Sequence, residues 1–158
     1  MPKKYAWAMN KNQIITILKQ AKPDHIELIK QAQSLLSNAP QNQVSKPVPC
    51  SDCLLGKWHR HEGFKLVNIP QLNELESLHK DIHNIYTALY YTTYDRRTKP
   101  RATVISAGME IPIQEKKFRT KKMKQLEKKT VKLVRSLDFI EKKVASMTEQ
   151  DFNSPWLT

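Results

Sequence analysis

The stretch QLNELESLHKDIHNIYTALYY, residues 71–91, places its apolar residues at helical spacing. They are Leu72, Leu75, Leu78, Ile82, Ile85 and Leu89. Apolar residues that recur every three or four positions line one side of an α-helix, so the stretch predicts a helix from about Pro70 to about Thr92. His79 and His83 lie four residues apart within it and are therefore neighbours on one helical face. Both imidazoles can reach a single metal ion.

Two more helices are expected before this one. Residues 13–20 and 24–37 predict a first helix that is kinked or broken at Pro23, because proline lacks the amide hydrogen and clashes with the preceding turn. Its apolar stripe is expected to contain Ile26, Ile29, Leu35 and Leu36. A proline-containing loop then leads to a short helix from about Ser51 or Asp52 to His61.

A long basic helix is expected near the C-terminus, over residues 114–147. Its apolar residues form one continuous stripe of helical period, made of Leu126, Leu133, Leu137, Ile140, Val144 and Met147. That stripe closes a bundle within the chain or pairs with a second subunit. Residues 102–112 are apolar and contain Gly108, and the pattern does not define their structure.

Length and composition predict one all-α domain over residues 1–158. The chain has only three glycines and few of the alternating patterns that strands require. We expect a four-helix-bundle-like fold with an additional short helix and the long basic C-terminal helix. The motif-bearing core spans about 13–92, a linker spans about 93–113, and the C-terminal helix spans about 114–147.

No secretory or membrane-spanning segment is expected. The first residues lack the apolar core of a secretory signal, and no run approaches the roughly 20 apolar residues that span a bilayer. We therefore expect a cytoplasmic protein. In a reducing compartment, the pair Cys50 and Cys53 favours metal or redox chemistry over a structural disulfide.

Two further residues are candidate metal ligands. Cys53 begins the segment CLLGKW, in which Gly56 permits close backbone approach and Trp58 supplies an apolar anchor. His25 lies beside the apolar stripe of the first helix and can point into a bundle. A lone histidine in such a place is more often a hydrogen-bonded core residue than a ligand.

The remaining cysteine and histidines have several possible roles. Cys50 is an ordinary loop cysteine, a fifth candidate ligand, or a thiol that forms a disulfide with oxidised Cys53. A thioredoxin-like pair is disfavoured because no βαβ pattern surrounds it. On a helix, His59 and His61 point about 200° apart, so both cannot face one metal. We expect them to be solvated or capping residues. The alternatives are that they support the ligand side chains or act as weak surface ligands.

Three blocks of the sequence follow one another in a recognisable order. They are His-x-x-Leu at 25–28, Cys-x-Leu-Gly-x-Trp at 53–58 and His-x-x-x-His at 79–83, separated by 24 and 20 residues. This order resembles the chemoreceptor zinc-binding domain of bacteria over about residues 13–92. Leu28 stands where an aromatic residue is common in that family, and no receptor signalling helix or cyclase domain is present in the sequence.

The resemblance implies an α-helical bundle that binds Zn²⁺ through His25, Cys53, His79 and His83. Members of the family are usually attached to chemoreceptors or to diguanylate cyclases, which make cyclic di-GMP. They sense zinc or oxidants such as hypochlorous acid, and they are commonly homodimers. The resemblance thus predicts a regulatory protein with a protein partner in chemotaxis or cyclic di-GMP control.

Catalysis is not expected. Four protein ligands fill a tetrahedral zinc site and leave no position for a reactive water. The sequence also lacks a P-loop, a glycine-rich dinucleotide turn and a Gly-x-Ser-x-Gly elbow.

Positive charge is concentrated in one block of the chain. Residues 94–135 contain 14 Lys or Arg and 4 Asp or Glu, so they supply +10 of the net charge of +12. A solvated face of an amphipathic helix accounts for this block, and an acidic protein or a membrane surface is a second interpretation. The alternative function is a zinc-stabilised protein that binds nucleic acid through phosphate contacts of residues 94–135.

Overall fold

A computed structural model of the chain describes residues 9–66, 69–94 and 113–153, and over these ranges it contains helices and connecting segments but no strand. The predicted all-α, bundle-like fold is confirmed. In chain order the elements are α1 (Lys11–Leu36), the 3-10 turn η2 (Gln41–Gln43), α2 (Leu54–Glu62), the 3-10 turn η3 (Gly63–Leu66), α3 (Pro70–Tyr94), α5 (Ile113–Ser146) and α6 (Glu149–Asn153).

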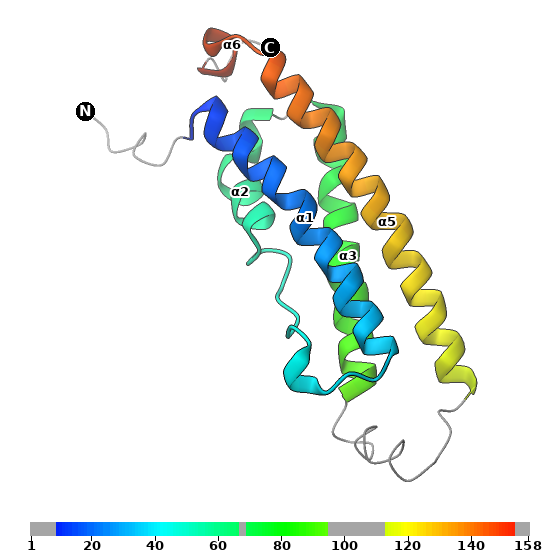
Figure 1. Ribbon diagram of the computed structural model, residues 1–158. Helices are drawn as coiled ribbons and strands as arrows, with labels where there is room; N and C mark the ends of the chain where they lie inside the picture. Colours follow the sequence, from blue (N-terminus) through cyan, green and yellow to red (C-terminus); the bar gives the residue numbers. More distant parts are fainter. Residues whose placement is uncertain (1–8, 67–68, 95–112, 154–158) are drawn as a thin grey trace.

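The three long helices pack side by side, with α1 and α3 running in the same direction and α5 running in the opposite one (Figure 1). The Lys11 ammonium donates to the carbonyl oxygen of Met147 at 2.6 Å, so the start of α1 lies beside the end of α5. Lys129 of α5 pairs with Asp81 of α3 at 2.7 Å. The short helix α2 covers one end of the α1 and α3 pair.

The apolar stripe of α5 packs within the chain. Its buried positions alternate by four and three residues, which keeps them on one side of the helix. They are Arg119, Met123, Leu126, Thr130, Leu133, Leu137, Ile140 and Val144. Because this stripe contacts both α1 and α3, it closes the bundle, which was one of the two roles expected of it.

We expected a kink or a break at Pro23; helix α1 is continuous through this residue, so the predicted break is wrong. At its start, Asn10 and Gln13 form a reciprocal capping box with two 2.9 Å hydrogen bonds. At its end, the buried guanidinium of Arg119 donates to the carbonyl oxygen of Leu35. A proline inside a helix costs about 3 kcal/mol, and burial of the apolar face on both sides of Pro23 outweighs that cost.

The buried stripe of α1 also differs from the expected one. The buried residues are Ile14, Ile17, Leu18, Ala21, His25, Ala32 and Leu35. Ile26, which we expected in this stripe, is 41% exposed. The reason is the register of the helix: His25 itself occupies the inward position, and the next residue is rotated by about 100°.

Other boundaries are close to the predicted ones. Helix α2 begins at Leu54, slightly later than predicted, because Cys53 is its N-cap. The predicted C-terminal helix is confirmed as α5. The turns η2 and η3 and the short helix α6 were not predicted, because three to five residues are too few for a periodic pattern. The expected linker falls almost entirely outside the described residues, and so does the apolar segment 102–112.

None of the described helices combines the length and the apolar character needed to cross a lipid bilayer.

Candidate metal centre

Two histidines of the candidate site lie on consecutive turns of α3. His79 and His83 are buried, and their ring centroids are 4.7 Å apart. The four-residue spacing therefore places both rings on one face, as predicted. That face is directed toward α1 and the segment before α2, since His83 Nδ1 hydrogen bonds to the carbonyl oxygen of Val48 at 2.9 Å.

The third histidine comes from α1. His25 is buried, and its ring centroid lies 4.9 Å from that of His79 and 5.5 Å from that of His83. The parallel packing of α1 and α3 brings the three rings together. Within its own helix, His25 Nδ1 hydrogen bonds to the carbonyl oxygen of Ala21 at 2.7 Å.

The hydrogen bonds of His25 and His83 select one tautomer for each ring. A carbonyl oxygen only accepts, so each Nδ1 carries the hydrogen and each Nε2 presents a lone pair when the ring is neutral. Both Nε2 atoms are buried and have no hydrogen-bond partner. A buried polar atom without a partner costs about 1–3 kcal/mol, so a ligand bound by both Nε2 atoms would remove this cost.

Cys53 supplies the sulfur atom from the N-terminus of α2. As the N-cap residue, its Sγ accepts a hydrogen bond from the backbone N–H of Gly56, with N and Sγ 3.4 Å apart. The same sulfur lies 3.4 Å from the carbonyl oxygen of Cys50 and 3.0 Å from His79 Nε2. The thiol is thus directed at the histidines by the local turn that starts its helix.

Gly56 is required by this turn. A Cβ atom at this position would lie 1.7 Å from the carbonyl oxygen of Cys50 and 2.8 Å from its carbonyl carbon. The expected close backbone approach at Gly56 is therefore confirmed, and the neighbour is the backbone of Cys50. Trp58, the predicted anchor, is buried in the core and fixes α2 to the bundle.

The four predicted residues come together as one group. His25, Cys53, His79 and His83 each offer one ligand atom, and these four atoms lie within 4.8 Å of one another. Ligand atoms on a tetrahedral zinc ion are about 3.3–3.6 Å apart, given Zn–N of about 2.0–2.1 Å and Zn–S of about 2.3 Å. Small side-chain movements would bring the four ligand atoms to this tetrahedral separation. Three nitrogens and one sulfur form a group that can hold a metal ion.

Burial keeps the three imidazoles neutral. Burial, followed by the neighbouring His25 and His83, lowers the pKa of His79 to about 3. Burial also lowers the pKa of His25 and that of His83. Neutral imidazole is the form that binds a metal. Burial raises the pKa of the Cys53 thiol, and a cation at the group would oppose this by favouring the thiolate.

The other sequence candidates lie outside the group in the described structure. The backbone carbonyl of Cys50 contacts the site, but its thiol is not one of the converging atoms. His59 stacks edge-on against Trp58, with ring centroids 6.3 Å apart, and His61 is exposed on α2. Neither histidine therefore belongs to the converging group, although His59 contributes to the lowering of the pKa of His79.

A row of tyrosines beside the site was missed at the sequence level. Below His83, the same face of α3 presents Tyr86, Tyr90 and Tyr94. Their hydroxyl groups bond to the segment that connects α1 to α2: Tyr86 donates to the carbonyl oxygen of Ser45, Tyr90 accepts from Gln41, and Tyr94 donates to the carbonyl oxygen of Ala39.

Together with His83, this row attaches the connecting segment to α3 over four successive turns and leads it back to Cys53. The sequence pattern could have predicted this row, because residues 79, 83, 86, 90 and 94 recur at helical spacing and therefore share one face of α3.

Comparisons of the chain with protein-family models, with curated proteins and with solved structures give no match.

Proposed function

We propose that the chain is a zinc-binding regulatory protein, in which His25, Cys53, His79 and His83 hold Zn²⁺ and couple its binding to helix packing. The observation that carries the proposal is the convergence of four nitrogen and sulfur atoms within 4.8 Å. The two buried, unpartnered Nε2 atoms support it. A merely structural histidine cluster would leave those atoms unsatisfied.

The donor set favours zinc over other common ions. Imidazole nitrogen and thiolate sulfur are the ligands of tetrahedral zinc sites, whereas calcium and magnesium prefer oxygen. No carboxylate belongs to the group. Bound zinc supplies four coordinate bonds without redox chemistry of its own. Four protein donors fill a tetrahedron, so the proposed role is regulatory and not catalytic.

The chain's own residues make the site a link among three helices. His25 fixes α1, Cys53 fixes the start of α2, and His79 fixes α3. Metal ligation contributes on the order of 10–16 kcal/mol in small zinc domains, which is comparable to the whole stability of a domain. Helix α2 has nine residues, and helices shorter than about 12–15 residues are marginal alone. Loss of the bonds between the metal and its ligands should therefore release α2 from the bundle before the longer helices.

Two inputs can act on such a link. One is a change in zinc availability. The other is an oxidant such as hypochlorous acid, because Cys53 is only partly buried and its thiolate is oxidised in a balanced two-electron step. The thiolate sulfur takes the oxygen of hypochlorous acid, chloride leaves, and Cys53 becomes a sulfenic acid. This product is a poor zinc ligand, so Cys53 would leave the site.

The proposed output is a protein partner in the cytoplasm. The motif order resembles the chemoreceptor zinc-binding domain, which supports a partner in chemotaxis or an enzyme of cyclic di-GMP metabolism. It also supports a homodimer. In this proposal the partner or the second subunit recognises the position of α2 and of the segment that precedes it.

Metal analysis of the purified protein tests the ligand assignment. We expect about one zinc per chain, lost or greatly weakened in Cys53→Ala and His83→Ala. Cys50→Ala and His61→Ala are the matched controls, because each removes the same type of side chain from outside the group, and both should keep the metal. An empty site in Cys50→Ala with zinc retained in Cys53→Ala would refute the assignment. Substitution with cobalt would report tetrahedral coordination through its absorption spectrum.

Zinc release under oxidation tests the regulatory input. Hypochlorous acid is added in small steps while a colorimetric chelator follows free zinc and mass spectrometry follows Cys53. Release in step with Cys53 modification is the expected result. Modification of Cys53 with the metal fully retained would remove the oxidant input.

A further inference from the structure

The solvent-facing side of α5 carries a dense set of positive charges that the metal centre does not use. Residues 113–135 contain 10 Lys or Arg and 2 Glu. Two of these cations have structural roles, since Arg119 bonds to the end of α1 and Lys129 pairs with Asp81. The others are directed mainly toward solvent.

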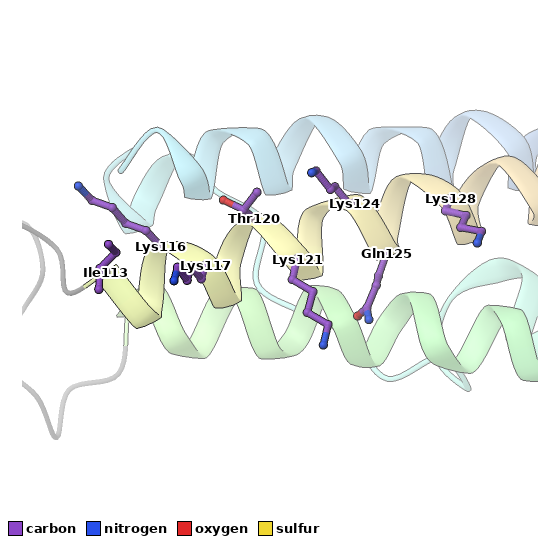
Figure 2. Close-up of a pocket in the computed structure, with 8 residues that line it drawn as sticks. All are labelled: Ile113, Lys116, Lys117, Thr120, Lys121, Lys124, Gln125 and Lys128. Atoms are coloured by element: carbon purple, nitrogen blue, oxygen red, sulfur yellow. The ribbon is translucent and has the colours of Figure 1, made fainter.

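Five lysines of this set line a shallow hollow of about 620 Å³ on the surface of α5. We call them the basic stripe: Lys116, Lys117, Lys121, Lys124 and Lys128. Figure 2 shows that all residues around the hollow come from α5, with Lys124 and Lys121 pointing to opposite sides of the helix surface. In the described part of the chain, none of the five pairs with a carboxylate.

The spacing of the stripe concentrates its charge. Lys117, Lys121, Lys124 and Lys128 are separated by four, three and four residues, so their backbone positions follow one another in a row along the same face of the helix, from which the side chains spread to both sides (Figure 2). The row covers about 16 Å along the helix axis at 1.5 Å per residue. Like charges at these separations repel one another and destabilise a helix. A bound polyanion would relieve this repulsion.

The chemistry of the surface discriminates among possible polyanions. Protein interfaces are poor in lysine at their centres and use aromatic or arginine anchors, whereas Ile113 is the one apolar residue lining the hollow. A membrane-bound amphipathic helix needs a free apolar face, and that of α5 is buried in the bundle. Phosphates of a nucleic acid need only closely spaced cations.

We propose that the basic stripe of α5 binds the phosphate backbone of nucleic acid without reading its sequence. The lysines act as point charges, and their contacts release counterions from the nucleic acid. The site is separate from the metal group, because none of the four candidate ligands lies on α5. The proposal therefore does not depend on zinc binding.

Fluorescence anisotropy with a labelled 20-base-pair DNA of mixed sequence tests the proposal. Five phosphate contacts predict a slope of about −4.5 in a plot of log affinity against log salt concentration. The affinity should then fall by about 500-fold between 50 and 200 mM salt. In the triple variant Lys121→Gln, Lys124→Gln and Lys128→Gln, two contacts remain, and the slope should become about −1.8. Affinity at 50 mM salt should fall at least about 100-fold.

A second triple variant controls for net charge. Lys46→Gln, Lys57→Gln and Lys80→Gln also remove three positive charges, from exposed positions that are not on α5. This control should keep the slope of log affinity against log salt concentration that the original protein shows. Circular dichroism should show the same helicity in all three proteins. An equal loss of affinity in both variants would overturn the proposal, because binding would then follow overall charge.

Two further results would also overturn it. One is the absence of DNA binding at 50 mM salt. The other is stripe-dependent binding that is as tight for polyglutamate or for vesicles of anionic phospholipid as for DNA of equal charge. In the second case the stripe would serve an acidic protein or a membrane surface.

Discussion

Replacement of Gly56 by alanine should disrupt the candidate metal centre without touching a ligand. The added Cβ would lie 1.7 Å from the carbonyl oxygen of Cys50, whereas a carbon and an oxygen atom need about 3.3 Å. The backbone must therefore move by about 1.5 Å. Cys53 lies between these two residues in the chain, and its sulfur is positioned by the N–H of Gly56. The displacement is transmitted directly to the sulfur.

The size of the effect follows from the tolerance of metal coordination. Metal–ligand distances in real sites agree within about 0.2 Å, so a movement several times larger removes Cys53 from the coordination sphere unless α2 shifts as a whole. Changes beside a ligand typically reduce metal affinity 10–100-fold, and we expect about 100-fold for Gly56→Ala. Overpacking of the turn should also lower the free energy of unfolding by about 1–3 kcal/mol.

Competition with a chromophoric chelator measures the zinc affinity, and urea unfolding in excess zinc measures stability. Gly63→Ala is the matched control. Gly63 has helical dihedral angles, φ −59° and ψ −27°, and the atoms nearest to its added Cβ would belong to the His59 side chain, the closest at 3.1 Å. It should keep the zinc affinity and change stability by less than about 1 kcal/mol. Equal zinc affinity in Gly56→Ala and in the original protein would refute the reasoning.

Two further substitutions test the packing that supports the site. Tyr86→Phe removes a hydroxyl that donates to the carbonyl oxygen of Ser45 at 2.5 Å. Urea unfolding should show that the free energy of unfolding falls by about 1 kcal/mol. The control is Tyr91→Phe, because Tyr91 is half-exposed, and it should change the free energy of unfolding by less than about 0.5 kcal/mol. Pro23→Ala restores an amide hydrogen inside the continuous helix α1 and should raise the free energy of unfolding by about 1–3 kcal/mol. A decrease would indicate that Pro23 relieves strain in α1.

The periodic parts of the fold were predictable from the sequence. The apolar stripes of α3 and α5 repeat over many turns, and such a repeat is the direct consequence of burying one side of a helix. The turns η2 and η3 and the short helix α6 have no such repeat and were not predicted. The continuity of α1 through Pro23 is a tertiary effect, because the local cost of proline is opposed by burial against α3 and α5.

The candidate site was predictable in its composition but not in its surroundings. The spacing of His79 and His83 determines that they share a face, and the motif order indicated His25 and Cys53. The hydrogen bonds that orient the rings come from backbone carbonyls of Ala21 and Val48. Every residue has a carbonyl group, so no sequence pattern marks the ones that will accept these bonds.

The sequence by itself determined the helical periods, the candidate ligand residues and the concentration of lysine on α5, because each is a property of residue type and spacing along one chain. Only the tertiary structure decided that the four ligand atoms meet, that His25 occupies an inward position of α1, and that the tyrosine row leads the connecting segment back to Cys53. These features depend on the parallel packing of α1 against α3 and on contacts between residues far apart in the sequence. Local patterns do not contain that information.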